Sequence, residues 1–121
     1  MEVNTRDQFE KLKSLKDFKG VIRSDSMEPF LKVGDEITVE VGVRELNRFD
    51  LIIFWRNNQM FCHCLWSINR FMEPIFLQSR CIKYQDREHP IPLIDYLGKV
   101  TSHQLPVRYK LKIILKEMFS H

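Results

Sequence analysis

The amino-acid sequence predicts a mainly β fold of antiparallel strands with a short N-terminal helix. The chain contains no alanine and only four glycines, whereas the β-branched and aromatic residues that favour strands are abundant. Residues 36–41 alternate polar and apolar side chains, which is the period of a half-buried strand. Residues 50–56 form a nearly continuous apolar run that is too short for an ordinary helix and is typical of a buried strand.

The predicted helix covers residues 6–16. Thr5 and Gln8 fit a capping box at its start, and the apolar residues that follow recur at roughly helical spacing. These apolar residues are Phe9, Leu12, Leu15 and Phe18. We expect this stripe to pack against the sheet.

The strands follow in chain order and are separated by turn residues. Asn57 and Asn58 form a turn pair, so the strand at residues 50–56 is expected to form a hairpin with the strand that follows it. The predicted strands are residues 20–23, 36–41, 50–56, 59–68, 74–79 and 97–101, with a polar, proline-containing loop at residues 83–92.

The tail, residues 105–121, carries two competing patterns. Tyr109, Leu111 and Ile113 alternate with lysines as in a strand, whereas Val107, Leu111, Ile114, Leu115 and Met118 form a helical stripe. The prediction is a strand that passes into a terminal helical turn. If the tail were helical, Arg108, Lys110, Lys112 and Lys116 would allow peripheral contact with anionic lipid.

Length and composition indicate one soluble domain over residues 1–121. The net charge of +3 comes from basic residues spread along the chain, so nucleic acid is not the expected partner. No apolar run approaches the roughly 18–20 residues of a membrane span. Three cysteines, an odd number, argue against a disulfide scaffold and for reduced thiols in a cytoplasmic setting. Cys62, Cys64 and Cys81 lack the usual spacing of metal ligands, so neither a metal nor another cofactor is expected.

The segment from Arg23 to Asp35 is the most informative part of the chain. Ser24 and Ser26 precede a Met-x-Pro-x-Leu-x-x-Gly-Asp run, in which Pro29 favours a turn over a helix. Ser26 is therefore expected at an exposed bend between two strands. A serine hydroxyl becomes a useful nucleophile only when a neighbouring base takes its proton. His63, in the middle of the second hairpin strand, is the expected base, since imidazole exchanges protons near neutral pH.

This segment resembles the nucleophile segment of type I signal peptidases, which belong to the same superfamily as LexA-type repressors. Residues 49–54 and 61–64 are similar to the family's next two strands, the second of which bears a histidine base in the archaeal and endoplasmic-reticulum enzymes. Residues 89–92 and 97–100 are similar to the proline-bearing loop and the Ile-Gly-Lys-Val strand that close the catalytic domain. The resemblance covers about residues 20–100 and implies a small signal-peptidase-like β fold.

The resemblance implies a role for each matching residue. Ser26 would be the nucleophile and His63 the general base. Ser24 and the backbone N–H of Ser26 would bind the oxyanion, and Met27 would border the substrate groove. The family's orienting aspartate is replaced by Arg80, and Asp86 is the nearest substitute.

The predicted function is a serine endopeptidase that cleaves a peptide or protein precursor bound along a sheet edge, without a membrane anchor. The alternative is a catalytically silent peptide-binding module of the same fold. A self-cleaving LexA-type repressor is disfavoured, because those proteins use a lysine base and cut an Ala-Gly or Cys-Gly bond that this chain lacks.

Overall fold

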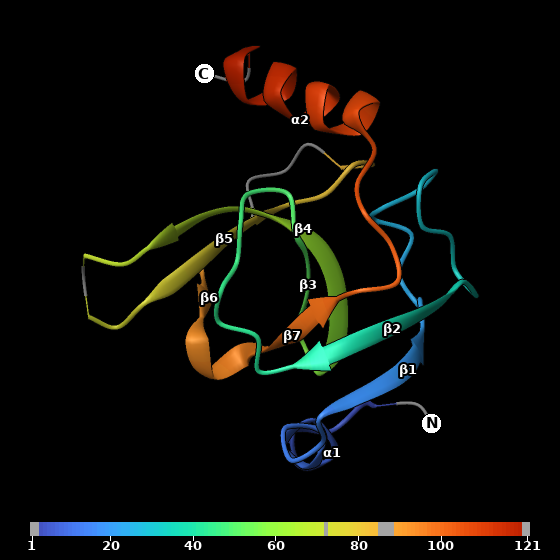
Figure 1. The fold of residues 1–121 in the computed structure, drawn as a ribbon, viewed down its shortest axis with the longest axis vertical. Helices are drawn as coiled ribbons and strands as arrows, with labels where there is room; N and C mark the ends of the chain where they lie inside the picture. The colour runs from blue at the N-terminus through green and yellow to red at the C-terminus, as the bar shows by residue number, and fades with distance from the viewer. Residues whose placement is uncertain (1–2, 72, 85–88, 120–121) are drawn as a thin grey trace.

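Seven antiparallel strands form the body of the protein in a computed structural model that describes residues 3–71, 73–84 and 89–119 (Figure 1). A short helix, α1 (Arg6–Leu12), precedes the sheet, and a longer helix, α2 (Val107–Phe119), follows it. The strands are β1 (Asp17–Val21), β2 (Glu36–Val41), β3 (Leu51–Arg56), β4 (Gln59–Asn69), β5 (Phe76–Arg80), β6 (Ile91–Pro92) and β7 (Tyr96–Val100), with a 3₁₀ turn, η1 (Leu93–Asp95), before β7. The predicted mainly β class is confirmed.

The order of the strands in the sheet is β1-β2-β7-β3-β4-β5-β6, so β1 is an edge strand. The strand β3 lies near the middle and is buried along most of its length, as its apolar run predicts. Its side chains alternate between two apolar clusters: Leu51, Ile53 and Trp55 pack in the larger cluster, and Ile52 and Phe54 pack in the smaller one. The sheet therefore has apolar side chains packed on both faces.

The β3–β4 hairpin forms as predicted. Asn57 and Asn58 both have positive φ angles, 53° and 60°, as a two-residue turn of this kind requires. Ile52 lies opposite His63 in the register of the hairpin. The strand β5 pairs with β4 only from Cys64 onward, so His63 lies at the point where that second neighbour begins.

The helix α1 begins as predicted and ends earlier. Thr5 and Gln8 form the capping box, and Phe9 and Leu12 are buried. The prediction extended the helix to residue 16, but the backbone N–H groups of residues 13–15 each donate to a carbonyl three residues back. This 3₁₀-type tightening closes the last turn and lets β1 begin at Asp17.

The predicted strand in the tail was wrong, because residues 107–119 form the helix α2. Pro106 precedes the helix, and its carbonyl accepts hydrogen bonds from the N–H groups of Tyr109 and Lys110. Proline favours the start of a helix, so Pro106 favours the helical pattern of the tail over the strand pattern. Ile113 is fully buried and packs in the larger cluster, with Tyr109 against it.

Two smaller differences concern the second half of the sheet. The predicted loop at residues 83–92 contains the two-residue strand β6, which pairs with Phe76 and Leu77 of β5. The strand β7 approaches β2 so closely at Gly98 that a Cβ atom there would collide with the Glu40 backbone and lie 3.0 Å from the Val41 Cα. Glycine is therefore required at this close approach of two paired strands.

Candidate active site

Ser26 lies in the turn between β1 and β2, where the backbone holds it from two sides. Within the turn, the N–H of Leu31 donates to the carbonyl of Met27, and both side chains are buried. From outside the turn, the N–H groups of Ile82 and Lys83 donate to the Ser26 carbonyl at 3.0 and 2.9 Å. Ser26 is only 5% exposed, so the prediction of an exposed bend was wrong. The segment that follows β5 covers it.

His63 faces Ser26 from β4. Its Nε2 atom lies 2.9 Å from the Ser26 Oγ atom, which is within hydrogen-bond distance. The imidazole packs edge-on to the ring of Phe54, with centroids 5.2 Å apart, and against Phe61 at 5.8 Å. These rings limit the orientation of the imidazole, and the side chain is largely buried.

Ser24 completes a chain of hydroxyl groups. Its Oγ lies 3.1 Å from the Ser26 Oγ as a donor and accepts from the Ser26 N–H at 3.3 Å. The structure therefore brings together the two serines and the histidine that the sequence indicated. In this arrangement both expected oxyanion donors lie directly beside the Ser26 hydroxyl.

Ser79 is a neighbour of the site that sequence reasoning missed. It lies on β5, is fully buried, and places its Oγ 3.5 Å from the Nδ1 of His63. When Nε2 of the neutral imidazole accepts a hydrogen bond from the Ser26 hydroxyl, the ring's hydrogen is on Nδ1. This N–H then donates toward the Ser79 Oγ. The available signal was the position of Ser79 next to Arg80, in the segment that resembles the one bearing the orienting acid of signal peptidases.

Asp25, between the two serines, turns its carboxylate away from them. Its oxygens accept hydrogen bonds from Lys83 Nζ and from the Tyr84 hydroxyl, each at 2.7 Å. The bond from Lys83 is the main reason that the pKa of Asp25 lies below its usual range, and the bond from Tyr84 is the next. The negative charge of Asp25 is thus paired with Lys83, away from the hydroxyl groups of Ser24 and Ser26.

The candidates for an orienting acid are placed differently. Asp86 lies outside the described residues. Arg80, at the position where the resemblance leads us to expect an acid, forms an ion pair with Glu117 of α2. Its guanidinium also lies over the ring of Trp66, 5.7 Å from the centroid. This arginine links β5 to the C-terminal helix.

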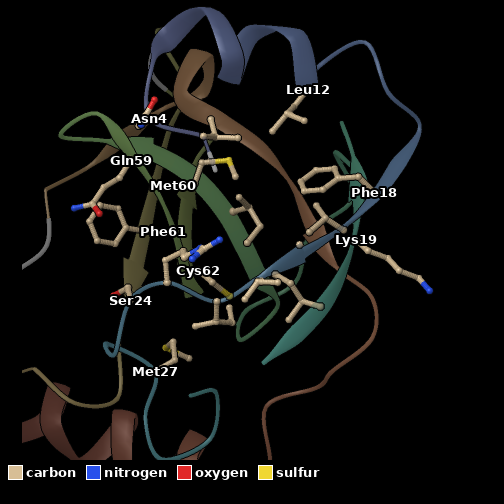
Figure 2. Close-up of a pocket in the computed structure, with 18 of the residues that line it drawn as sticks. Asn4, Leu12, Phe18, Lys19, Ser24, Met27, Gln59, Met60, Phe61 and Cys62 are labelled. Carbon is tan, nitrogen blue, oxygen red and sulfur yellow. The ribbon is translucent and has the colours of Figure 1, made fainter. Parts of the chain in front are cut away.

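A pocket of about 590 Å³ opens beside Ser24 (Figure 2), and neither Ser26 nor His63 is among the residues that line it. Ser24, two positions before Ser26, and Met27, directly after it, both line the pocket. Its walls come from β1, from the tip of the β3–β4 hairpin and from the N-terminal segment, and Phe18, Leu12 and Met60 are among the apolar side chains that point into it. Met27, predicted to border the substrate groove, is therefore among the residues that line this pocket.

The cysteines are buried, reduced thiols. Cys62 and Cys64 pack in the larger cluster, on the face of β4 opposite His63. Burial raises the pKa of the Cys62 thiol to about 12. Within the described ranges, no group of three or more His, Cys, Asp or Glu side chains is arranged to hold a metal ion.

Neither described helix is long and apolar enough to cross a membrane. Comparisons of the chain with models of protein families, with curated proteins and with solved structures found no match. The geometry of the site and the sequence motif that predicted it are therefore the grounds for assigning a function.

Proposed function

We propose that the protein is a serine endopeptidase in which Ser26 is the nucleophile and His63 the general base. The observation that carries this proposal is the 2.9 Å separation between Ser26 Oγ and His63 Nε2. The two residues come from a turn and a strand that are 37 positions apart in the sequence. Such an arrangement of hydroxyl, base and neighbouring donors is the one that acyl transfer requires.

In the first half of the proposed reaction, the Ser26 Oγ attacks the carbonyl carbon of the scissile peptide bond. His63 Nε2 takes the hydroxyl proton, and the resulting imidazolium then gives it to the leaving amine as the C–N bond breaks. An ester between Ser26 and the acyl part of the substrate remains. In the second half, His63 takes a proton from water as the water attacks the ester, and the imidazolium then returns a proton to Ser26 Oγ as the C–O bond breaks and the peptide acid is released.

The Ser24 hydroxyl and the Ser26 N–H are the proposed oxyanion donors. In the resting site the Ser26 N–H donates to the Ser24 Oγ, so the Ser24 side chain must rotate to free this N–H and to direct its own hydroxyl toward the substrate. The required movement is a rotation about one side-chain bond. A donor placed in this way stabilises the tetrahedral intermediate more strongly than the ground state.

The proposed substrate is an extended peptide segment with an apolar side chain near the cleaved bond. The strand β1 has an outer edge beyond which no further strand lies in the described structure, and β1 residues line the pocket together with Ser24. An extended peptide can hydrogen-bond to such an edge while alternate side chains enter the pocket. Phe18, Ile37 and Met60 give this pocket its apolar character.

The second candidate function is a peptide-binding module without turnover. It is favoured by one observation, that the two oxyanion donors are bonded within the resting site and not directed outward. Both candidates use the same pocket and the same sheet edge. They differ in whether the bound peptide is cut.

Incubation with a mixed peptide library, followed by mass spectrometry of the products, separates the two functions. The enzyme predicts discrete cleavage products that disappear in Ser26→Ala and in His63→Gln. Ser14→Ala and His89→Gln, which change an exposed serine and an exposed histidine elsewhere, serve as matched controls and should retain full cleavage. Peptide retention without any product in the wild type would favour the binding module, and products that persist in Ser26→Ala would exclude the proposed nucleophile.

A further inference from the structure

The helix α2 has two apolar faces, only one of which the fold uses. Tyr109 and Ile113 face the body and pack in the larger cluster. On the other side Val107, Leu111, Leu115 and Met118 recur at positions i, i+4, i+8 and i+11, which places them on one stripe of the helix. We call these four residues the outer stripe. Their exposed fractions are 67%, 54%, 52% and 65%.

The position of α2 leaves the outer stripe accessible. The helix lies across one end of the molecule, outside the sheet, so that one of its sides faces away from the body (Figure 1). Phe119, which is 78% exposed, adds a further apolar side chain at the end of the helix. A continuous row of exposed apolar residues on one helix face marks an interaction surface.

The charges around the outer stripe indicate what it contacts. The helix carries four basic residues, Arg108, Lys110, Lys112 and Lys116, and one acidic residue, Glu117. Glu117 pairs with Arg80 of the body, so its charge is compensated locally. Arg108 and Lys112 are exposed and border the stripe. An apolar stripe bordered by cations is complementary to a surface with an apolar interior and anionic groups at its boundary.

We infer that α2 docks on the surface of an anionic lipid bilayer, with the outer stripe in the boundary between headgroups and acyl chains. The helix has 13 residues and is therefore about 20 Å long, which is too short to cross the roughly 30 Å hydrocarbon core. It lies in the plane of the interface, as amphipathic helices of this composition do. A second copy of the chain fits the stripe less well, because the two sets of basic residues would then face each other.

This docking would hold the candidate active site close to the bilayer. Lys116 Nζ donates to the carbonyl of Ile82 at 2.6 Å, and the Ile82 N–H donates to the carbonyl of Ser26 at 3.0 Å. The helix is thus joined to the Ser26 turn through a single intervening residue. The membrane inference itself does not depend on whether Ser26 acts as a nucleophile.

Vesicle flotation with the full chain tests the inference. The wild type should float with vesicles of phosphatidylcholine and phosphatidylserine at least about tenfold better than with phosphatidylcholine alone, since each basic residue at an anionic surface contributes roughly fivefold. Leu111→Gln combined with Leu115→Gln should abolish flotation. Ile94→Gln is the matched control, because Ile94 is also 65% exposed but its carbonyl contacts Lys13 beside α1.

A second variant keeps the test decisive if the double leucine variant does not fold. Arg108→Gln combined with Lys112→Gln changes only exposed polar positions and should remove the preference for anionic vesicles. Ser26→Ala should float like the wild type, which separates this test from that of the peptidase. Absence of wild-type flotation, or equal flotation of the folded double leucine variant, would overturn the inference. A dimer in light scattering that Leu111→Gln and Leu115→Gln convert to a monomer, without flotation, would assign the stripe to a second copy.

Discussion

Three side chains define the candidate chemistry at the scale of single residues. Ser24, Ser26 and His63 can all be predicted from the sequence. The motif at residues 23–35 contains the two serines, and the order of the hairpin strands that follow indicates the histidine. Their placement in one hydrogen-bonded chain is what the structure adds. Two features at this scale could not be predicted. The direction of the Asp25 carboxylate depends on Lys83 and Tyr84, and the approach of Ser79 depends on the pairing of β4 with β5.

Ser24→Ala should lower kcat by about 100- to 1,000-fold with little change in KM, because it removes one of the two proposed oxyanion donors, a loss of roughly 2.7–4 kcal/mol. The fold should be unaffected, since the hydroxyl bonds only within the site in the contacts described. Steady-state kinetics on a peptide cleaved by the wild type, with Ser14→Ala as the control, measures the effect. Full activity of Ser24→Ala would remove this residue from the oxyanion site.

Ser79→Ala should reduce kcat by up to about tenfold, because Ser79 acts through the orientation of His63 and a hydrogen bond of this kind contributes about 0.5–1.5 kcal/mol. The KM should stay the same, since the side chain lies behind the imidazole and not in the pocket lining. Separate measurement of kcat and KM distinguishes this positioning role from a loss of stability, which a thermal melt would report. A change confined to KM would contradict the assignment.

Local signals in the sequence predicted most of the elements, and the exceptions have physical causes. The capping box fixed the start of α1, and the Asn57-Asn58 turn fixed the β3–β4 hairpin. The tail was predicted incorrectly because its apolar residues satisfy both periods, and tertiary packing of Ile113 together with the preceding Pro106 selects the helix. The two-residue strand β6 was too short to produce any periodic signal.

The close approach of the paired strands β7 and β2 at Gly98 leads to a prediction about stability. Gly98→Ala should destabilise the protein by about 1–3 kcal/mol, because the added Cβ would be forced against the Glu40 backbone, which cannot rotate away. Chemical denaturation measures this free energy of unfolding. Gly42→Ala is not a suitable comparison, since Gly42 has a φ angle of +76°, but Gly20→Ala, where the nearest atom is a Phe18 side-chain carbon at 3.4 Å, should cost less. An equal loss at both positions would contradict the close approach.

The burial of β4 predicts the behaviour of its thiols. With a pKa of about 12, Cys62 has on the order of 1,000-fold less thiolate at neutral pH than an ordinary thiol. Iodoacetamide should therefore leave Cys62 unmodified in the folded protein and alkylate it after denaturation. Peptide mapping by mass spectrometry locates the adducts. Rapid native labelling of Cys62 would show that this strand is more open than the structure indicates.

At the scale of the whole molecule, the candidate site exists because a curved sheet brings the β1–β2 turn to the middle of β4. The segment after β5 then closes over Ser26 through the N–H groups of Ile82 and Lys83. Strand periodicity alone contains no information about this long-range contact. It could be anticipated only through the family resemblance, which places a serine turn and a base-bearing hairpin strand together. The burial of Ser26 was not anticipated, because the covering segment is remote in sequence.

The most direct measurement is the reaction of the full chain with a fluorophosphonate, followed by intact-mass and peptide-mapping mass spectrometry. A single phosphonyl adduct on Ser26 should form in the wild type and in the His89→Gln control. The adduct should be absent in Ser26→Ala and slowed at least about 100-fold in His63→Gln, because general-base assistance contributes about 100- to 10,000-fold. An unmodified Ser26, or an adduct that forms equally fast without the imidazole, would contradict the claim that His63 activates Ser26.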